Sequence, residues 1–252
     1  MGLAKMIKLS RPSKPSELTD KLVLQLTSDF KRDGKSVWAH SFIKQPLMTM
    51  SSNKCAFCET KIDEESKYVE VEHFHHKDLY KDEVVDWENL LPSCKKCNGT
   101  KGDHDTKIEP IINPCEQDPK DHLKIWRYRL KGKTAFGKLT ISTLNLNEPD
   151  RLVKKRFQVG NALQDKLEEY QELVDDVVDG TQTSTRRKNR IKNGVKEILT
   201  KGLKDKEYAG TYSTILLTDP EYSALRDKMK SCYLWTEEHD QLEQTLTYHI
   251  LV

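Results

Sequence analysis

The amino-acid sequence predicts a mostly helical α+β protein, in which a small metal-binding module lies between N-terminal helices and a C-terminal helical region. Two CxxC motifs, with short strand-like segments between them, predict the module, which we expect to contain two strands and a helix. Apolar residues at helical spacing after residue 147 predict the helical region. We therefore divide the chain into residues 1–54, 55–147 and 148–252.

The first segment is predicted to be helical and to pack against the module. Pro12 and Pro15 bound a loop, and a helix is expected to begin at Ser16 or Thr19. The apolar positions of this helix are Leu22, Leu24, Leu26 and Phe30. A second, shorter helix is expected over Ser36–Phe42.

In the module, we expect strands at Lys67–Val71 and Trp87–Leu91, followed by a short helix within Asn98–Thr106. Glycines in that last segment weaken the helical prediction. Two further strands are expected at Trp126–Leu130 and Lys138–Ser142, because apolar and polar residues alternate there around a turn that contains glycine.

The C-terminal segment contains one long amphipathic pattern, which ends at Gly180. Its apolar stripe is Val159, Leu163, Leu167, Tyr170, Val174 and Val177. The stripe is typical of a core helix, although a helix that binds a partner has the same pattern. Further helices are expected over Thr185–Leu203, Tyr208–Leu217 and Pro220–Leu234. The basic run 186–192 fits either a solvated helix face or a phosphate contact.

The composition limits the function classes. The 252 residues are 36% hydrophobic and 33% charged, and the net charge is only +2, so charge alone does not indicate nucleic-acid binding. No apolar run approaches the roughly 20 residues of a membrane span, and the N-terminus lacks a signal-peptide pattern. We therefore expect no membrane association and a cytoplasmic location, where paired cysteines more often hold metal than form disulfides.

The two CxxC motifs predict a structural zinc site. Cys55, Cys58, Cys94 and Cys97 supply the four thiolates of a closed tetrahedral site, which would join the two ends of the module. A thioredoxin-like redox role for Cys55 and Cys58 is the weaker alternative, because it needs only one pair and a βαβ context that is missing here.

A second group of residues suggests catalysis. Glu72 and His73 are adjacent at the end of an expected strand, and Asn98 directly follows the second CxxC motif. A histidine can take a proton from water near neutral pH, while carboxylate and amide oxygens suit Mg²⁺ or Mn²⁺. Phosphodiester hydrolysis needs both functions. An isolated Glu-His pair is more often a surface feature, so the prediction depends on the flanking CxxC motifs.

Together these residues resemble the HNH (ββα-metal) endonuclease superfamily. The matching string is CxxC, Glu72-His73, Asn89-Leu90, CxxC-Asn98 and Lys101. The resemblance implies that His73 is the general base and that Glu72 and Asn98 bind Mg²⁺ or Mn²⁺. It also implies that Asn89 orients the active-site loop and that Lys101 contacts phosphate.

A narrower resemblance is to the PtuB group, the HNH nucleases of Septu-type anti-phage systems, which also occur as retron-associated effectors. It is carried by Val71–Phe74, Trp87–Leu90, Ser93–Asn98 and the later Ile112–Pro114 and Leu144–Asn147. The resemblance implies a partner ATPase of the ABC/SMC-like class, called PtuA, and in retron systems a reverse transcriptase–noncoding RNA complex. It implies a nucleic-acid substrate, with DNA favoured and RNA left open.

The sequence departs from the resemblance at one loop. After Phe74 the PtuB group has a basic residue, a proline and a lysine, whereas this chain has His75, His76 and Lys77. His75 and His76 become candidate phosphate or metal contacts, and we expect His76 and Lys77, together with Lys101, to contact nucleic acid. The alternative function is a non-catalytic zinc module that binds nucleic acid or a partner protein.

Overall fold

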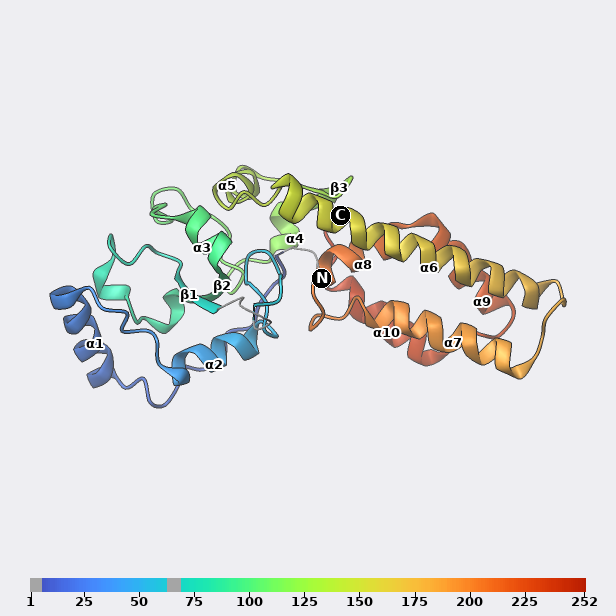
Figure 1. The fold of residues 1–252 in the computed structure, drawn as a ribbon, viewed down its shortest axis with the longest axis horizontal. Coiled ribbons are helices and arrows are strands. Elements are labelled where there is room, and N and C mark those ends of the chain that lie inside the picture. The colour runs from blue at the N-terminus through green and yellow to red at the C-terminus, as the bar shows by residue number, and fades with distance from the viewer. Residues whose placement is uncertain (1–5, 63–68) are drawn as a thin grey trace.

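The computed structural model of the protein describes residues 6–62 and 69–252, and it is elongated, with two lobes (Figure 1). The first lobe contains α1 (Asp20–Asp33), α2 (Ser41–Met50), β1 (Val69–His73), β2 (Leu90–Cys94), α3 (Lys95–Lys101), α4 (Pro119–His122), β3 (Leu123–Trp126), β4 (Arg129–Gly132) and α5 (Ala135–Thr143). The second contains α6 (Lys154–Val178), α7 (Thr185–Thr200), α8 (Ala209–Thr218), α9 (Pro220–Ser231) and α10 (Glu237–Thr247). The predicted fold class, a mostly helical α+β protein, is confirmed.

The predicted strand, strand and helix unit is present. Strands β1 and β2 are antiparallel, with Glu72 opposite Leu91 and His73 opposite Leu90. Helix α3 begins directly after β2, and the Cys94 sulfur accepts a hydrogen bond from the backbone N–H of Cys97 at its first turn (3.4 Å). The first strand was expected over Lys67–Val71; its first two residues lie outside the described part of the chain, and the strand continues two residues further than expected.

Helix α1 begins where predicted, with the Thr19 side chain accepting a hydrogen bond from the N–H of Leu22. Leu26 and Phe30 are buried, but Leu24 is 73% exposed. Leu24 was expected to be an apolar position of this helix, and that prediction is wrong. Residues two apart are separated by about 200° around a helix, so Leu24 faces away from Leu22 and Leu26.

The second helix was predicted too early in the sequence. It spans Ser41–Met50 instead of Ser36–Phe42, and it contains Pro46. Proline removes one helical hydrogen bond and therefore argues against a helix at this position. Ile43 and Leu47 are almost completely buried, and this burial offsets the loss.

The two later strands were also misplaced. Strand β3 pairs with β4 in a tight hairpin whose turn residues, Arg127 and Tyr128, both have positive φ values (46° and 63°). The segment predicted as a strand over Lys138–Ser142 belongs to helix α5. Thr134 caps this helix by accepting a hydrogen bond from the N–H of Gly137 (3.1 Å). The sequence did not indicate this cap, because the apolar residues after it alternate as in a strand.

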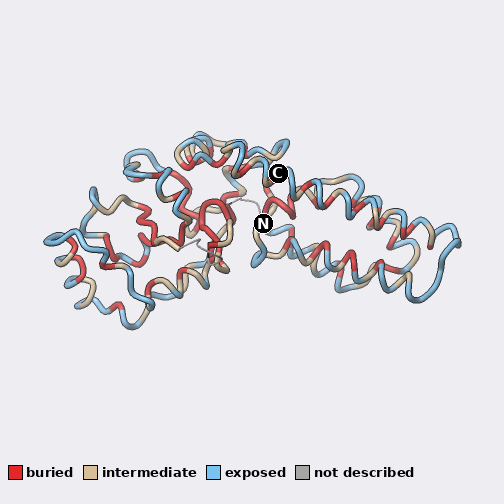
Figure 2. Tube along the Cα trace, in the orientation of Figure 1, coloured by how far each residue is buried: buried red, intermediate tan, exposed pale blue. Residues whose placement is uncertain are grey.

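Three cores stabilise the described chain, and Figure 2 shows where the buried residues lie. The first surrounds the cysteines and includes N-terminal residues, among them Met6 and Leu9. The second packs α1 and α2 against the β1–β2 sheet. The third is the helical bundle, in which the predicted stripe of α6 packs against α7 and α9. The stripe is therefore core, and α10 is a further helix that the sequence did not predict.

Buried contacts connect the two lobes. The Lys54 ammonium, 2% exposed, pairs with Glu59 (2.9 Å) and donates hydrogen bonds to the carbonyls of Lys204 (2.6 Å) and Lys206 (2.9 Å). The Tyr208 hydroxyl hydrogen-bonds to that of Thr60 (2.8 Å). The turn that carries the first CxxC motif is therefore fastened to the α7–α8 loop. Within the described residues, no helix has the length and apolar character needed to cross a membrane.

Candidate functional site

The four cysteines of the CxxC motifs converge. Cys55 and Cys58 come from a turn, and Cys94 and Cys97 from the start of α3. Their ligand atoms all lie within 4.8 Å of one another, and the sulfurs of Cys58 and Cys94 are 3.7 Å apart. A tetrahedron with metal–sulfur bonds of about 2.3 Å has edges of about 3.8 Å. The cluster could therefore hold a zinc ion, as the sequence predicted.

Two residues that the sequence did not single out support the cysteines. The Thr60 hydroxyl lies 3.2 Å from the Cys58 sulfur, and the Arg151 guanidinium lies 3.9 Å from the same atom. Four thiolates around one Zn²⁺ would carry two negative charges, and the Arg151 guanidinium would offset one of them. Arg151 is 93 residues from Cys58 in sequence, so no spacing pattern could have identified it.

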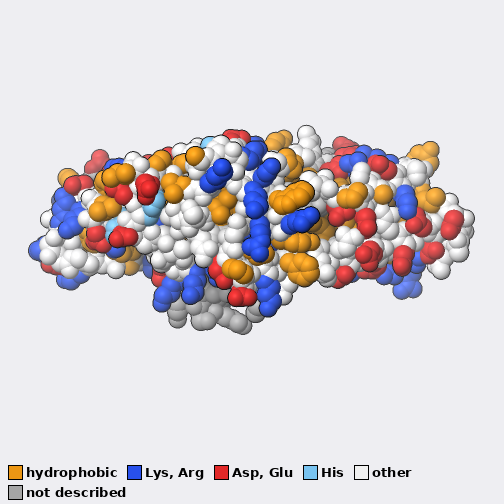
Figure 3. Space-filling view, turned by 90° about the horizontal axis from the view of Figure 1, so that it is seen from above, with side chains coloured by type: hydrophobic (Ala, Val, Ile, Leu, Met, Phe, Trp, Pro, Cys, Tyr) orange, Lys and Arg blue, Asp and Glu red, His pale blue; other side chains and the backbone are white. Residues whose placement is uncertain are grey.

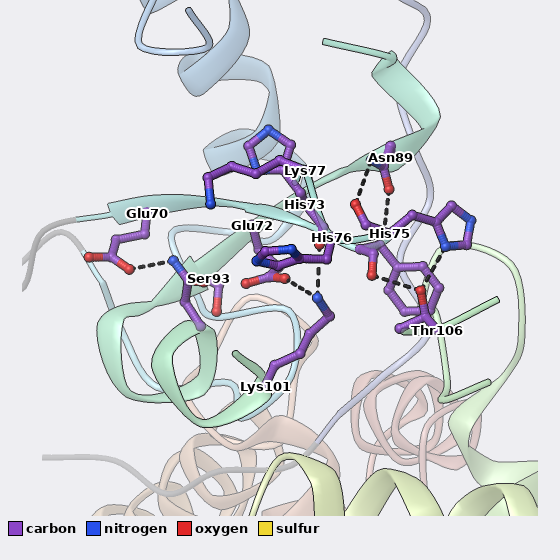
Figure 4. Close-up of polar contacts among 12 residues, drawn as sticks. Glu70, Glu72, His73, His75, His76, Lys77, Asn89, Ser93, Lys101 and Thr106 are labelled. Atoms are coloured by element: carbon purple, nitrogen blue, oxygen red, sulfur yellow. Dashed lines mark hydrogen bonds and ion pairs between the residues drawn. The ribbon is translucent and has the colours of Figure 1, made fainter. Parts of the chain in front are cut away.

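Glu72 is a buried carboxylate with one unsatisfied oxygen. It projects from β1 toward α3, where its Oε1 atom pairs with the Lys101 ammonium (2.7 Å) (Figure 4). The Oε2 atom is buried and has no hydrogen-bond partner. Burial raises the pKa of Glu72 to about 7, while the charge of Lys101 acts to lower it. An unsatisfied buried carboxylate oxygen is costly, and a bound cation would satisfy it.

Lys101 does not occupy the position expected for a phosphate contact. Its ammonium is buried, pairs with Glu72 and donates a hydrogen bond to the carbonyl of His73 (2.9 Å). This geometry does not favour a phosphate contact, because the charge is directed into the module instead of toward solvent. In this structure Lys101 fixes the end of β1 and balances the charge of Glu72.

Asn98 lies next to Glu70, a carboxylate that the sequence did not single out. Its amide nitrogen donates a hydrogen bond to Glu70 Oε2 (2.5 Å), which leaves the amide oxygen as an available acceptor. Glu70 and Glu72 are two residues apart on β1 and therefore project from the same face of the strand, the face covered by α3. This alternation was visible in the sequence and could have identified Glu70.

His73 projects from the opposite face of β1, as strand geometry predicts. Its Nε2 atom lies 2.9 Å from the carbonyl of Val84, and its ring packs edge-on against Trp38, with centroids 4.5 Å apart. Because a carbonyl can only accept, Nε2 carries the hydrogen and Nδ1 is the basic nitrogen. Burial lowers the pKa of His73 to about 4, so the imidazole is neutral at neutral pH.

Asn89 holds the loop that follows β1. Its side-chain oxygen accepts a hydrogen bond from the N–H of His75 (2.6 Å), and its amide nitrogen donates to the carbonyls of His75 and Glu83 (both 3.1 Å). The His75 ring hydrogen-bonds to the Thr106 hydroxyl (2.7 Å), which itself donates to the carbonyl of Phe74 (2.9 Å). These bonds fix the loop without the proline of the PtuB group, and His75 acts in them as a structural residue.

A cavity of about 420 Å³ unites the candidate residues. Its lining includes Glu70, Glu72, His73, His76, Lys77 and Asn98, together with Trp38 and Lys44. Figure 4 shows His76 and Glu72, which both line this cavity. Oxygen ligands, a neutral imidazole and two further side chains suited to phosphate thus share one cavity.

Two known proteins resemble this chain. The Septu protein PtuB of Bacillus thuringiensis is 42% identical over 247 residues, which are 98% of this chain and 96% of the relative. The Septu protein PtuB of Bacillus mycoides (strain KBAB4) is 29% identical over 47% of this chain and 54% of its own length. No family model and no solved structure matches the chain.

Proposed function

The chain belongs to the PtuB family of Septu defence proteins, and from this premise we propose that it is a metal-dependent HNH endonuclease. It would hydrolyse phosphodiester bonds in nucleic acid, with DNA favoured over RNA, as the nuclease of an anti-phage complex. The observation that carries the proposal is a single cavity that contains both a neutral histidine and a buried carboxylate with an unsatisfied oxygen.

His73 is the proposed general base. Hydrolysis requires removal of a proton from the attacking water, and Nδ1 of a neutral imidazole can accept that proton. The Val84 carbonyl fixes the tautomer, and the Trp38 ring restrains the imidazole. The low pKa of His73 keeps this base unprotonated at neutral pH.

Glu72 and Asn98 are the proposed ligands of Mg²⁺ or Mn²⁺. The unsatisfied Oε2 atom of Glu72 and the available amide oxygen of Asn98 are ligand types that these cations prefer. When bound, the cation stabilises the negative charge that develops on the phosphate oxygens. Glu70 is a positioning residue in this proposal, because its hydrogen bond to the amide nitrogen of Asn98 orients the amide.

The zinc cluster and the loop residues have supporting roles. Cys97 immediately precedes Asn98 in α3, so a zinc ion held by the four cysteines would fix the position of this ligand. His76 and Lys77 line the cavity and are the proposed phosphate contacts. Asn89 holds the loop that carries them, through its bonds to His75.

The proposed partner is a PtuA-like ABC/SMC-type ATPase. The retron reverse transcriptase–RNA complex stays a prediction from the resemblance. We propose that the ATPase delivers the nuclease to its substrate or releases its activity. Cleavage assays are therefore informative only if they include samples with the ATPase.

The test is a cleavage screen of plasmid DNA and total RNA. The wild-type protein, alone and with the ATPase, is incubated with Mg²⁺, with Mn²⁺, or without an added divalent cation. We expect cleavage only in the samples with the cation. If no nucleic acid is cut in any combination, the nuclease proposal fails and the non-catalytic zinc module replaces it.

A further inference from the structure

We propose that the outer face of the β3–β4 hairpin binds a single-stranded segment of nucleic acid, with a base stacked on Trp126 and phosphates paired with the surrounding cations. We call Lys124, Trp126, Arg127, Arg129 and Lys131 the hairpin surface. The inference rests on the nuclease function proposed above and adds a second contact for its substrate, outside the cavity that contains His73.

The pairing of the two strands places these residues on one face. Lys124 is opposite Lys131, and Trp126 is opposite Arg129. The alternate positions, Leu123 and Leu130, are almost completely buried against the first core. Because successive side chains of a strand project to opposite faces, the two cross-strand pairs face solvent together.

The charge of this region differs from that of the chain as a whole. Residues 122–147 contain no aspartate or glutamate and include Lys124, Arg127, Arg129, Lys131, Lys133 and Lys138. The cations of the hairpin surface form no salt bridge with any residue in the described ranges 6–62 and 69–252. A cluster of cations without acidic partners attracts a polyanion.

The basic run on α7, which the sequence had suggested as a phosphate contact, is different. Arg187 pairs with Asp176, and Arg190 pairs with Glu169 (2.8 Å). Both acidic partners belong to α6, so these arginines bridge two helices of the bundle. Part of the charge of this run is therefore already balanced, which makes the hairpin surface the stronger candidate for contact with phosphate.

The aromatic side chain indicates which form of nucleic acid would bind. Trp126 is 61% exposed, and the Arg127 guanidinium lies 5.6 Å from the centre of its ring. Phe157 of α6 is also exposed and packs edge-on against Tyr128, the second residue of the hairpin turn. Exposed rings among cations are typical of surfaces that bind single strands, because only an unpaired base can stack on a ring.

The space-filling view agrees with this description. Figure 3 shows Lys and Arg side chains gathered beside hydrophobic ones near the middle of the long axis. The β3–β4 hairpin and the first turns of α6 lie at this position along the molecule in Figure 1. The hairpin surface is therefore close to the junction of the two lobes.

The test is fluorescence anisotropy with labelled oligothymidylate and oligouridylate of about 20 nucleotides, longer than the ~4–16 nucleotides that one such surface covers. The full-length protein carries His73→Ala so that the probe is not cut. Trp126→Ala should weaken binding roughly 5- to 150-fold, and Trp126→Phe should retain most of the affinity, because a ring remains. The double substitution Lys124→Ala and Lys131→Ala should reduce the slope of log affinity against log salt by about 1.4.

Matched controls separate this surface from exposed residues in general. Tyr233→Ala removes a ring that is 90% exposed, and the double substitution Arg186→Ala and Lys188→Ala removes one exposed and one half-buried cation from α7. These controls should bind as tightly as the parent protein, with an unchanged salt slope. Melting temperatures should be equal throughout, because all the substituted side chains are at the surface.

Two results would overturn the inference. The hairpin variants could bind both oligonucleotides as tightly as the controls do, or the parent protein could bind neither oligonucleotide. The comparison of the two affinities shows whether the hairpin surface prefers oligothymidylate or oligouridylate. Cleavage by the wild-type protein is measured separately. If the wild-type protein cuts nothing but the hairpin variants lose oligonucleotide binding, this inference is supported and the nuclease proposal fails.

Discussion

Glu72 and His73 are neighbours in sequence, yet burial shifts their pKa values in opposite directions. The pKa of Glu72 rises to about 7 and that of His73 falls to about 4, because burial penalises the charged form of each group. The raised pKa of Glu72 costs folding stability above its ordinary value of 4.5, and the lowered pKa of His73 costs folding stability below its ordinary value of 6.5. Such shifts cluster where a chain positions reactive groups, and here the two side chains line one cavity. The low pKa of His73 keeps the imidazole unprotonated, as a proton acceptor must be before the reaction, while the unsatisfied oxygen of Glu72 suits a cation.

The cysteine cluster gives a prediction for a single residue. Cys94→Ser removes one of four converging sulfurs, while the serine hydroxyl can still accept the hydrogen bond at the start of α3. We expect loss of bound zinc and a decrease in the free energy of unfolding of about 4 kcal/mol or more, since binding energy at such a site is folding energy. Metal analysis and thermal melting measure the two effects.

Cys232→Ser is the matched control, because Cys232 is half-buried in the helical bundle and outside the cluster. It should leave the zinc content unchanged and shift the melting temperature only slightly. Equal zinc content in the Cys94→Ser protein would contradict the four-thiolate site.

At the scale of elements, long amphipathic helices were predictable and short elements were not. The six apolar positions of α6 repeat at helical spacing over several turns, so α6 was placed correctly. The predictions for α2 and α5 were wrong for local reasons. Helix α2 contains Pro46, and apolar and polar residues alternate around Leu139 and Ile141 of α5 as they would in a strand. Tertiary burial and capping by Thr134 decided these cases, and neither is visible in a short window of sequence.

Helix α5 also gives a test of how closely the elements pack. A Cβ atom at Gly137 would lie 2.1 Å from the carbonyl oxygen of His122, which belongs to the backbone and cannot move aside cheaply. Gly137→Ala should therefore lower the free energy of unfolding by about 1–3 kcal/mol, even though alanine favours helix. Urea denaturation measures the change.

Gly99→Ala in α3 is the matched comparison. A Cβ atom at Gly99 would meet nothing within 4 Å, so this substitution should be neutral or stabilise the protein by up to about 1 kcal/mol. If Gly137→Ala were also neutral, that result would contradict the close contact between α5 and the end of α4.

At the scale of the whole molecule, the sequence predicted several residues that line the cavity but few of the residues that surround them. The cysteines, Glu72, His73 and Asn98 were identified because their spacing is local and characteristic. Trp38, Val84 and Arg151 were missed because they reach the site from separate segments, and only the fold brings them there. The contacts between the lobes were missed for the same reason, since Lys54 and Lys204 are 150 residues apart.

Lys54 gives a prediction for the connection between the lobes. Lys54→Met keeps a long side chain but removes the ion pair with Glu59 and two hydrogen bonds to the α7–α8 loop. Removing one partner of a buried pair is expected to cost about 3–5 kcal/mol of unfolding free energy. Lys21→Met, at an exposed position of α1, is the control and should change little. Equal stability of the two variants in thermal melting would show that the lobes are held together by other contacts.

The central claim is that the protein cuts nucleic acid with His73 as the general base, in a cavity positioned by the zinc site. The most direct test of this claim is the cleavage rate of His73→Ala. With metal and partner conditions fixed, the rate should fall by about 10²- to 10⁴-fold. Zinc content should stay equal to that of the wild-type protein, and His104→Ala, a histidine outside the cavity, should cut normally. Cleavage by His73→Ala at the wild-type rate would contradict the account.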